Sequence, residues 1–192
     1  MTRQTNRVAR GVAAPLAVLV LGGILVLSVQ LRPYWVARYR GGGANLQGVS
    51  LPGASLRGAQ LGWANLTRAS LARVDLTGAM LPGAKLSQAD LAGANLTGAV
   101  FQGASLAGAV LRGAQLSEAD LGQARLTGAD LSGADLRGAR LVGTDLTNAN
   151  LKGTDMSNTT WASLKVRGAN YDVHTRWPGA FDPQSEGAVK VP

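Results

Sequence analysis

The sequence predicts an all-β solenoid preceded by a single membrane-spanning α-helix, and three features support this fold class. An uncharged and mostly aliphatic stretch occupies residues 11–31. From residue 44 onward, a hydrophobic residue recurs at every fifth position. Charged residues make up only 16% of the 192 residues, whereas about 25% is usual in soluble globular domains. This composition excludes an ordinary mixed core enclosed by a charged shell.

Residues 11–31 are predicted to cross a membrane as one helix, because about 20 apolar residues span a bilayer. Residues 1–10 form a basic tail before it, and residues 32–43 form a juxtamembrane linker whose aromatic residues suit the headgroup region. A cleaved signal peptide is the alternative. Its apolar run is usually about 7–15 residues long and ends in small residues, whereas this longer run ends in Gln30-Leu31-Arg32-Pro33.

The orientation of this helix depends on the lysines and arginines near its two ends. Three arginines precede the apolar stretch and three follow it, so only the N-terminal amine distinguishes the two sides. We therefore expect a single-pass protein of the cell membrane, with its N-terminus inside and its repeats outside.

The formal net charge of +8 is concentrated at the N-terminus. Residues 1–40 contain six arginines and no acidic residue, and residues 41–170 contain eleven basic and eight acidic residues. Residues 171–192 contain two basic and three acidic residues, so the three segments carry +6, +3 and −1. The nearly balanced repeat region offers no basic stripe with stacking aromatics, so nucleic-acid binding is not expected.

A five-residue repeat occupies residues 44–171, with 26 central positions from Leu46 to Tyr171. Leucine fills 21 of these centres, alanine lies two residues before 20 of them, and glycine lies two residues after 16 of the first 25. Leucines five residues apart would scatter around an α-helix and would alternate between the faces of a flat strand. We therefore expect each quintet to be a short extended piece plus a corner, so that the leucines and alanines all point to one axis.

This pattern closely resembles the pentapeptide repeat family, in which a small residue and Asp or Asn precede a central Leu or Phe. The resemblance covers residues 44–171 and implies a right-handed quadrilateral β-helix with four quintets per coil. On that basis the 26 quintets make about six and a half coils, which form a rod about 30 Å long at the sheet spacing.

With four quintets per coil, residues 20 apart stack into outward columns. We expect Arg125, Asp145 and Lys165 to alternate in one column, with Asp120 and Arg140 adjacent in another, as charge compensation between coils. Asp135 and Asp155 also stack, and a carboxyl pair about 5 Å apart would suit a retaining glycosidase. Both lie on a convex surface near Arg137, so the prediction is a protein that is not an enzyme and needs no cofactor or metal.

One face is unusually apolar and is the candidate partner site. Met80 and Val100 replace the polar residue before the centre in adjacent coils, and Trp63 and Pro82 share that face. Exposed apolar patches on a repeat surface can mark binding sites. The alternatives are drift in a tolerant repeat, or burial of the patch by the linker that follows the membrane helix.

Residues 172–192 are predicted to cap the last coil and to form the C-terminal tail. The tail resembles segments that follow many pentapeptide arrays, with Trp-Pro and Phe-Asp-Pro at similar intervals. Its aromatic residues are expected to cover the core and its prolines to end strand pairing. The predicted cap residues are Trp161, Tyr171, Trp177 and Phe181. The single histidine, His174, has no cysteine or second histidine with which to form a metal site, so a structural role is expected.

Two functions from different classes remain open. One is a membrane-tethered structural module whose rod binds an unidentified protein, with self-association possible through the first coil or the apolar patch. The other is implied by the family, some of whose members imitate DNA and protect DNA gyrase. The positive repeat region and the predicted anchor disfavour this second function.

Overall fold

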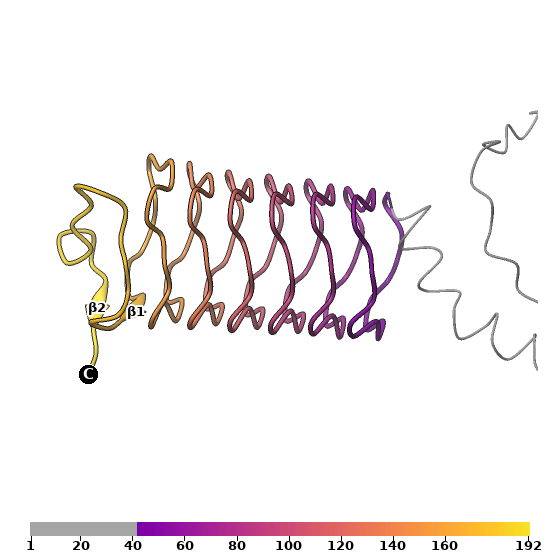
Figure 1. Ribbon diagram of the computed structural model, residues 1–192, viewed down its shortest axis with the longest axis horizontal. Coiled ribbons are helices and arrows are strands. Elements are labelled where there is room, and N and C mark those ends of the chain that lie inside the picture. The colour runs from indigo at the N-terminus through magenta and orange to yellow at the C-terminus, as the bar shows by residue number, and fades with distance from the viewer. Residues whose placement is uncertain (1–41) are drawn as a thin grey trace, which may run out of the picture. The chain divides into compact units, whose positions relative to one another are not determined.

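The computed structural model describes residues 42–192 (Figure 1). The predicted basic tail, the predicted membrane helix and all but the last two residues of the predicted linker lie outside this range. Within residues 42–192, no helix is long and apolar enough to span a bilayer.

The described chain forms a stack of coils in which each coil lies directly on the next (Figure 1). The residue before each centre bridges in parallel to the residue 20 positions later, from Asn45↔Asn65 through Asn150↔Asn170. Since 20 residues are four quintets, the predicted four-sided coil is confirmed. Regular strands occur only at the C-terminal end of the described residues, where β1 (Asn170–Tyr171) pairs with β2 (Val189–Lys190).

Backbone hydrogen bonds hold the coils together and also close each corner. The N–H of Leu96 donates to Gln115 of the next coil at 2.7 Å, and Asn95 donates to Val74 of the preceding coil at 2.9 Å. Within the corner, the Ala99 N–H donates back to the carbonyl of Leu96 at 3.0 Å. Each quintet therefore contributes both to the inter-coil ladder and to its own turn.

The interior is filled by the central leucines and the alanines that precede them. Side chains from Leu56 to Leu151 at these positions are at most 1% exposed, and Phe101 is the largest fully buried side chain. Thr144 and Thr154 replace alanine in the later coils, and their hydroxyls donate to the carbonyls of Leu121 and Leu131 at 2.8 and 2.9 Å. The buried hydroxyls are thus satisfied, and the core remains close-packed.

A left-handed backbone conformation occurs at every corner. All 25 residues that lie two positions after a centre, from residue 48 to residue 168, have φ between 51° and 70°. Glycine adopts this conformation without steric cost, which explains its recurrence there. Nine other residues also adopt it, and an L-residue in this region costs about 1 kcal/mol.

Most Asp and Asn residues that precede a centre cap their own corner, a role not predicted from the sequence. One carboxylate oxygen of Asp75 accepts the backbone N–H of Thr77 at 3.1 Å and its hydroxyl at 2.6 Å. Asn95 accepts the backbone N–H of Thr97 at 3.2 Å in the same way. These Asx turns satisfy a donor that the coil-to-coil ladder leaves free.

The C-terminal tail brings the four predicted cap residues together. Trp177 stacks on Phe181 with ring centroids 5.1 Å apart, while Trp161 meets Phe181 edge-on at 4.9 Å and Tyr171 meets Trp177 edge-on at 5.4 Å. This cluster lies against the hydrophobic core at the C-terminal end of the stack.

The expectation that the tail prolines end strand pairing is wrong. Arg176 bridges Asp155, and after Pro178 and Pro183 the tail pairs again through β2, where Val189 donates to Ala169 at 2.8 Å. The prolines interrupt the ladder only locally. After Arg176 the tail crosses two of the four sides of the coil without bridging, and on the next side β2 pairs with β1. Residues 172–190 therefore add one incomplete coil to the stack.

We predict that Leu96→Lys destabilises the solenoid by more than about 4 kcal/mol, because it would bury an uncompensated charge. Asn95→Lys should cost only about 1 kcal/mol, since it removes one partly buried corner hydrogen bond between uncharged groups. Circular dichroism and thermal melts of residues 41–192 measure both. Equal stability of the two variants would refute the inward orientation of the leucines.

The corner conformation gives a second prediction. Gly98 has φ of 63° and no atom within 4 Å of the position that a Cβ would take, so a substitution there reports backbone strain without a clash. Gly98→Ala should lower the free energy of unfolding by about 1–2 kcal/mol. Gly98→Asn should cost less, because Asn tolerates this region and occupies it naturally at Asn148 and Asn158. Denaturant unfolding tests this order, and an Ala variant as stable as the parent would contradict it.

Candidate functional site

The outer surface of residues 42–192 is the place for a binding site, because side chains fill the interior of the stack. Bridged residues form four outward columns, one on each side of the coil. One of them, the Met80 column, consists of Gln60, Met80, Val100, Asp120, Arg140 and Thr160.

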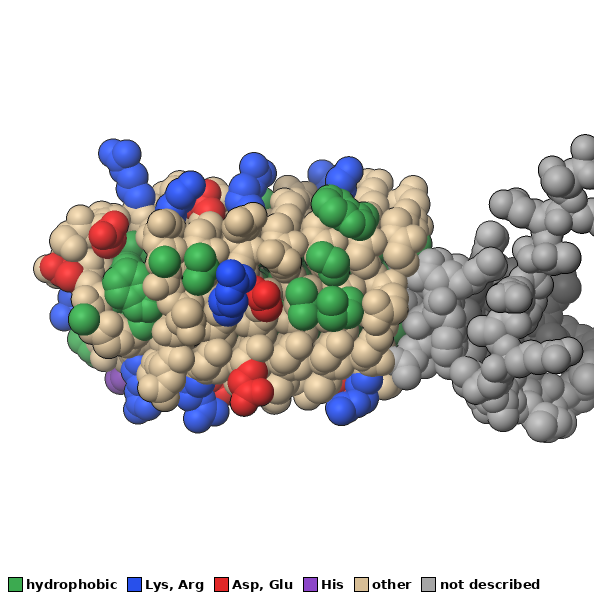
Figure 2. Space-filling view, turned by 90° about the horizontal axis from the view of Figure 1, so that it is seen from above, with side chains coloured by type: hydrophobic (Ala, Val, Ile, Leu, Met, Phe, Trp, Pro, Cys, Tyr) green, Lys and Arg blue, Asp and Glu red, His purple; other side chains and the backbone are tan. Residues whose placement is uncertain are grey.

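The structure brings the four residues of the candidate partner site together. Met80 bridges Val100 of the next coil, and the Trp63 N–H donates to the carbonyl of Pro82 at 2.8 Å. Trp63 is 74% exposed and Met80 is 36% exposed. Figure 2 shows separate hydrophobic areas on one face of the described rod, some toward its N-terminal end and a large one at its C-terminal end. We call Trp63, Met80, Pro82 and Val100 the apolar patch.

Trp63 occupies a left-handed corner, as eight other non-glycine residues do. Its φ is 61°, and a bulky residue is a genuine outlier in the left-handed region. The ring lies over Gly83 of the next coil, and a Cβ at Gly83 would overlap the six-membered ring of the indole. Glycine at residue 83 is therefore required for this position of Trp63. Strain of this kind persists where the surrounding structure imposes it, and it often accompanies function.

The hydrophobic residue Met80 has a local explanation in Pro82. Asp and Asn residues before a centre accept the N–H two positions later, as Asp75 and Asn95 do, but proline has no N–H to cap. Ser50, which precedes Pro52 by two residues in an earlier coil, is likewise neither Asp nor Asn. A proline two residues after the residue that precedes a centre was therefore the sequence signal for a corner without this cap. Val100 lacks this explanation, because Gln102 carries an N–H.

Ion pairs decorate the remaining outer surface. Asp120 accepts from Arg140 at 3.0 Å, which is the pairing between adjacent coils expected from the sequence. Arg125, Asp145 and Lys165 also stack as expected. Burial alone would raise the pKa of Asp145, but hydrogen bonds from Thr147 and the charges of Lys165 and Arg125 lower it. The other ion pairs of the described residues are Arg57–Asp75, Arg112–Asp130, Arg137–Asp135 and Arg176–Asp155.

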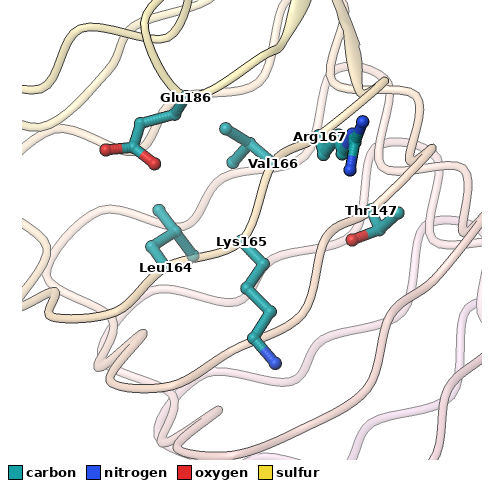
Figure 3. A pocket seen from close by; sticks show the side chains of 6 residues that line it. All are labelled: Thr147, Leu164, Lys165, Val166, Arg167 and Glu186. Atoms are coloured by element: carbon teal, nitrogen blue, oxygen red, sulfur yellow. The ribbon is translucent and has the colours of Figure 1, made fainter.

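An open groove of about 260 Å³ lies where the C-terminal tail passes over the last coil without pairing. Figure 3 shows Glu186 of the tail on one side and Arg167 on the other, with Val166 between them and Leu164 below Glu186. Lys165 points away from these four side chains (Figure 3). The sequence analysis missed this groove, because it depends on the path of the tail.

A family model for pentapeptide repeats matches the chain in eight copies, over residues 42–71, 59–98, 69–106, 94–133 and 124–160. These matches together cover more than half of the chain. The chain belongs to the pentapeptide repeat family. Because proteins of this family fold as right-handed quadrilateral β-helices, the expected architecture of the repeats is confirmed.

Solved structures of other pentapeptide repeat proteins are similar to this one. A protein from the thylakoid lumen of Arabidopsis thaliana is 33% identical, with a TM-score of 0.51 over 52% of this chain and 70% of that chain. Rfr23 from the cyanobacterium Cyanothece 51142 is 31% identical, with a TM-score of 0.39 over 68% of this chain and 98% of its own.

QnrB1, a plasmid-mediated fluoroquinolone resistance protein, is 19% identical, with a TM-score of 0.35 over 71% of this chain and 88% of its own. A likeness at this level carries no argument about function. No curated protein matches the chain.

The carboxylates of this pentapeptide repeat protein do not match a glycosidase pair. Asp135 and Asp155 bridge as expected, but each accepts from its own arginine, Arg137 at 2.7 Å and Arg176 at 3.4 Å. The hydrogen bond from Arg137 lowers the pKa of Asp135. Burial alone would raise the pKa of Asp155, but hydrogen bonds from Ser157 and the charge of Arg176 lower it. A glycosidase requires one carboxyl group with a raised pKa to act as the acid.

The single histidine of the pentapeptide repeat protein is an exposed residue of the tail. The backbone N–H of His174 donates to Asp172 at 3.0 Å, in another Asx turn. Asp172 also accepts the N–H of Gly153 at 2.9 Å, which joins the tail to the preceding coil. Among residues 42–192, no group of three or more histidine and carboxylate side chains is arranged to bind a metal.

The lowered pKa of Asp135 predicts a pH dependence of stability. A group whose pKa is depressed in the folded state stabilises the protein above its unfolded pKa, about 3.9, and loses that effect as the pH falls further. Asp135→Asn keeps an acceptor for the Arg137 N–H but loses the ion pair. The variant should therefore be less stable than the parent at pH 7, and the difference should disappear toward pH 2.

Urea unfolding between pH 2 and pH 7 measures this difference. Asn95→Ala is the matched control, because it removes an uncharged corner cap and should lower stability by a similar amount at every pH. A deficit of Asp135→Asn that persisted unchanged at pH 2 would contradict the ionic origin of the effect.

Proposed function

We propose that this chain is a non-enzymatic, membrane-anchored pentapeptide repeat protein that serves as a rigid structural and protein-interaction module. Residues 11–31 hold it in the lipid bilayer, and the repeats are displayed outside the cell membrane. The observation that carries the proposal is the continuous stack of coils, in which the ladder fixes each outward side chain about 4.8 Å from the equivalent one in the next coil.

The packed core supports a scaffold role. Leucine and alanine fill the axis from coil to coil, so the stack presents fixed columns of side chains instead of a ligand cavity. Binding on a concave site of about 300 Å³ or more is typical of small-molecule ligands. The groove at the tail, at about 260 Å³, is below this range.

The surface charges oppose imitation of DNA. That role needs a long and strongly negative surface, whereas five of the acidic residues are paired with arginines in the described solenoid. Residues 41–170 carry a net charge of +3, from eleven basic and eight acidic residues. We therefore favour an interaction module over gyrase protection.

Protease accessibility in intact spheroplasts tests the proposal. With a C-terminal tag on the full chain and a cytoplasmic protein as control, we expect the protease to digest the tag while the control survives. Deletion of residues 11–31 should move the protein from the membrane fraction to the soluble fraction. A protected tag would place the repeats in the cytoplasm and reopen cytoplasmic partners, and retention of the deletion variant in the membrane would refute the anchor.

A further inference from the structure

We propose that residues 33–40 of the same chain cover the apolar patch. This linker segment reads Pro-Tyr-Trp-Val-Ala-Arg-Tyr-Arg and immediately precedes the glycines that lead into the first coil. The inference concerns an intramolecular contact, and it holds whether or not residues 11–31 lie in a membrane.

The apolar patch is an uncharged area with a definite boundary. Residues 60–63, 80–83 and 100–103 occupy this side of three successive coils and include no charged residue. The next coils place Asp120 and Arg140 in the same column, and these two form an ion pair. Over the same three coils the other sides carry Arg57, Arg68, Arg73, Asp75, Lys85 and Asp90. One side of the N-terminal coils is therefore apolar while its neighbours are charged.

The described chain begins beside this patch. The Gly43 N–H donates to the carbonyl of Gly62 at 2.7 Å, and Gly62 directly precedes Trp63. A Cβ on Gly42 would lie 4.0 Å from the carbonyl oxygens of Gln60 and Gly62. Gly43 adopts φ of 66°, and three consecutive glycines, residues 41–43, allow the backbone to reverse sharply here. The described chain therefore begins at the edge of the patch.

The linker segment is long enough to cover the patch. Tyr39 precedes Gly42 by three residues and Trp35 precedes it by seven. At about 3.3 Å per extended residue, they reach about 10 Å and about 23 Å from Gly42. The patch spans two coil spacings from Trp63 to Val100, or about 10 Å along the rod. Both aromatic side chains therefore reach it.

The size of the patch favours a tethered occupant over a separate molecule. A standard interface between proteins involves about 20–30 residues on each side, far more than the four residues of the patch. A short tether supplies an effective concentration in the millimolar range, which makes a small contact sufficient. A second copy of the chain would have to form the same small contact without that advantage.

The chemistry of the linker segment matches the patch. Its aromatic rings pack favourably against the indole of Trp63 and against the thioether of Met80. Residues 60–63, 80–83 and 100–103 contain no cation that would repel Arg38 and Arg40. A guanidinium also stacks well on an exposed indole. The corner at Trp63 keeps that indole on the outer surface, where the residue is 74% exposed.

Disulfide trapping tests the proposal, because the chain has no cysteine of its own. In the full-length protein, Tyr39→Cys combined with Met80→Cys should form an intramolecular disulfide under mild oxidation, detected by peptide mass mapping. The matched control combines Tyr39→Cys with Ser70→Cys, which lies on the opposite side of the coil. We expect the first pair to cross-link at least about tenfold faster, given a millimolar local concentration at the patch alone.

A second measurement uses the Met80→Cys variant alone. Replacement of residues 33–40 by a Gly-Ser sequence of equal length should increase the rate of maleimide labelling at residue 80 several-fold. Equal cross-linking of the two pairs, or labelling unaffected by the replacement, would overturn the proposal. Intermolecular disulfides between two Met80→Cys chains would also overturn it and would assign the patch to a second copy.

Discussion

The left-handed corner is the constraint on which the rest of this structure depends. Each quintet must turn the chain by about a quarter of a coil, and every residue from 48 to 168 that lies two positions after a centre adopts positive φ. With the corners fixed, residues 20 apart fall into register and form the parallel ladder. The ladder in turn places leucine over leucine and alanine over alanine along the axis. The outward columns follow from the same register.

The aspartates that precede the centres hydrogen-bond to their own corners, so these side chains already have partners within the solenoid. Asp75, Asp135 and Asp155 each accept a backbone N–H two residues later, and their pKa values are lowered partly for this reason. A carboxylate committed to a corner and to an arginine is a poor proton donor. The aspartates in the columns thus stabilise the scaffold. This favours a surface that displays side chains to a partner over one that performs catalysis.

The two ends of the described rod are built differently. At the C-terminal end, four aromatic residues and an incomplete coil cover the last layer of the core. At the N-terminal end, Leu46 and Leu51 are slightly more exposed than the leucines of the middle coils, and Ala44, Val49 and Ala54 are only partly buried. The apolar patch begins at this same end. A linker segment that covers the patch would shield the end of the rod that the tail does not reach.

The sequence by itself determined the repeat and the inward leucines and alanines, because a strict five-residue period leaves one geometry that buries every leucine. The four-sided coil and the vertical neighbours in each column came from the resemblance to the pentapeptide repeat family, since the period alone does not fix the number of quintets per coil. The sequence also predicted which four aromatic residues would meet at the C-terminal end. The local role of the polar residues and the reason for Met80 beside Pro82 were readable in principle but were missed.

Only the tertiary structure decided the path of the tail and the groove that it leaves. Residues 172–190 have no period, so nothing in their order shows that Arg176 pairs with a shift of one residue or that pairing resumes after Pro183. The position of the Trp63 ring also required the fold, because it depends on Gly83 of the next coil leaving room for the indole. Periodic packing can be inferred from sequence, whereas contacts that break the period depend on the three-dimensional path of the chain.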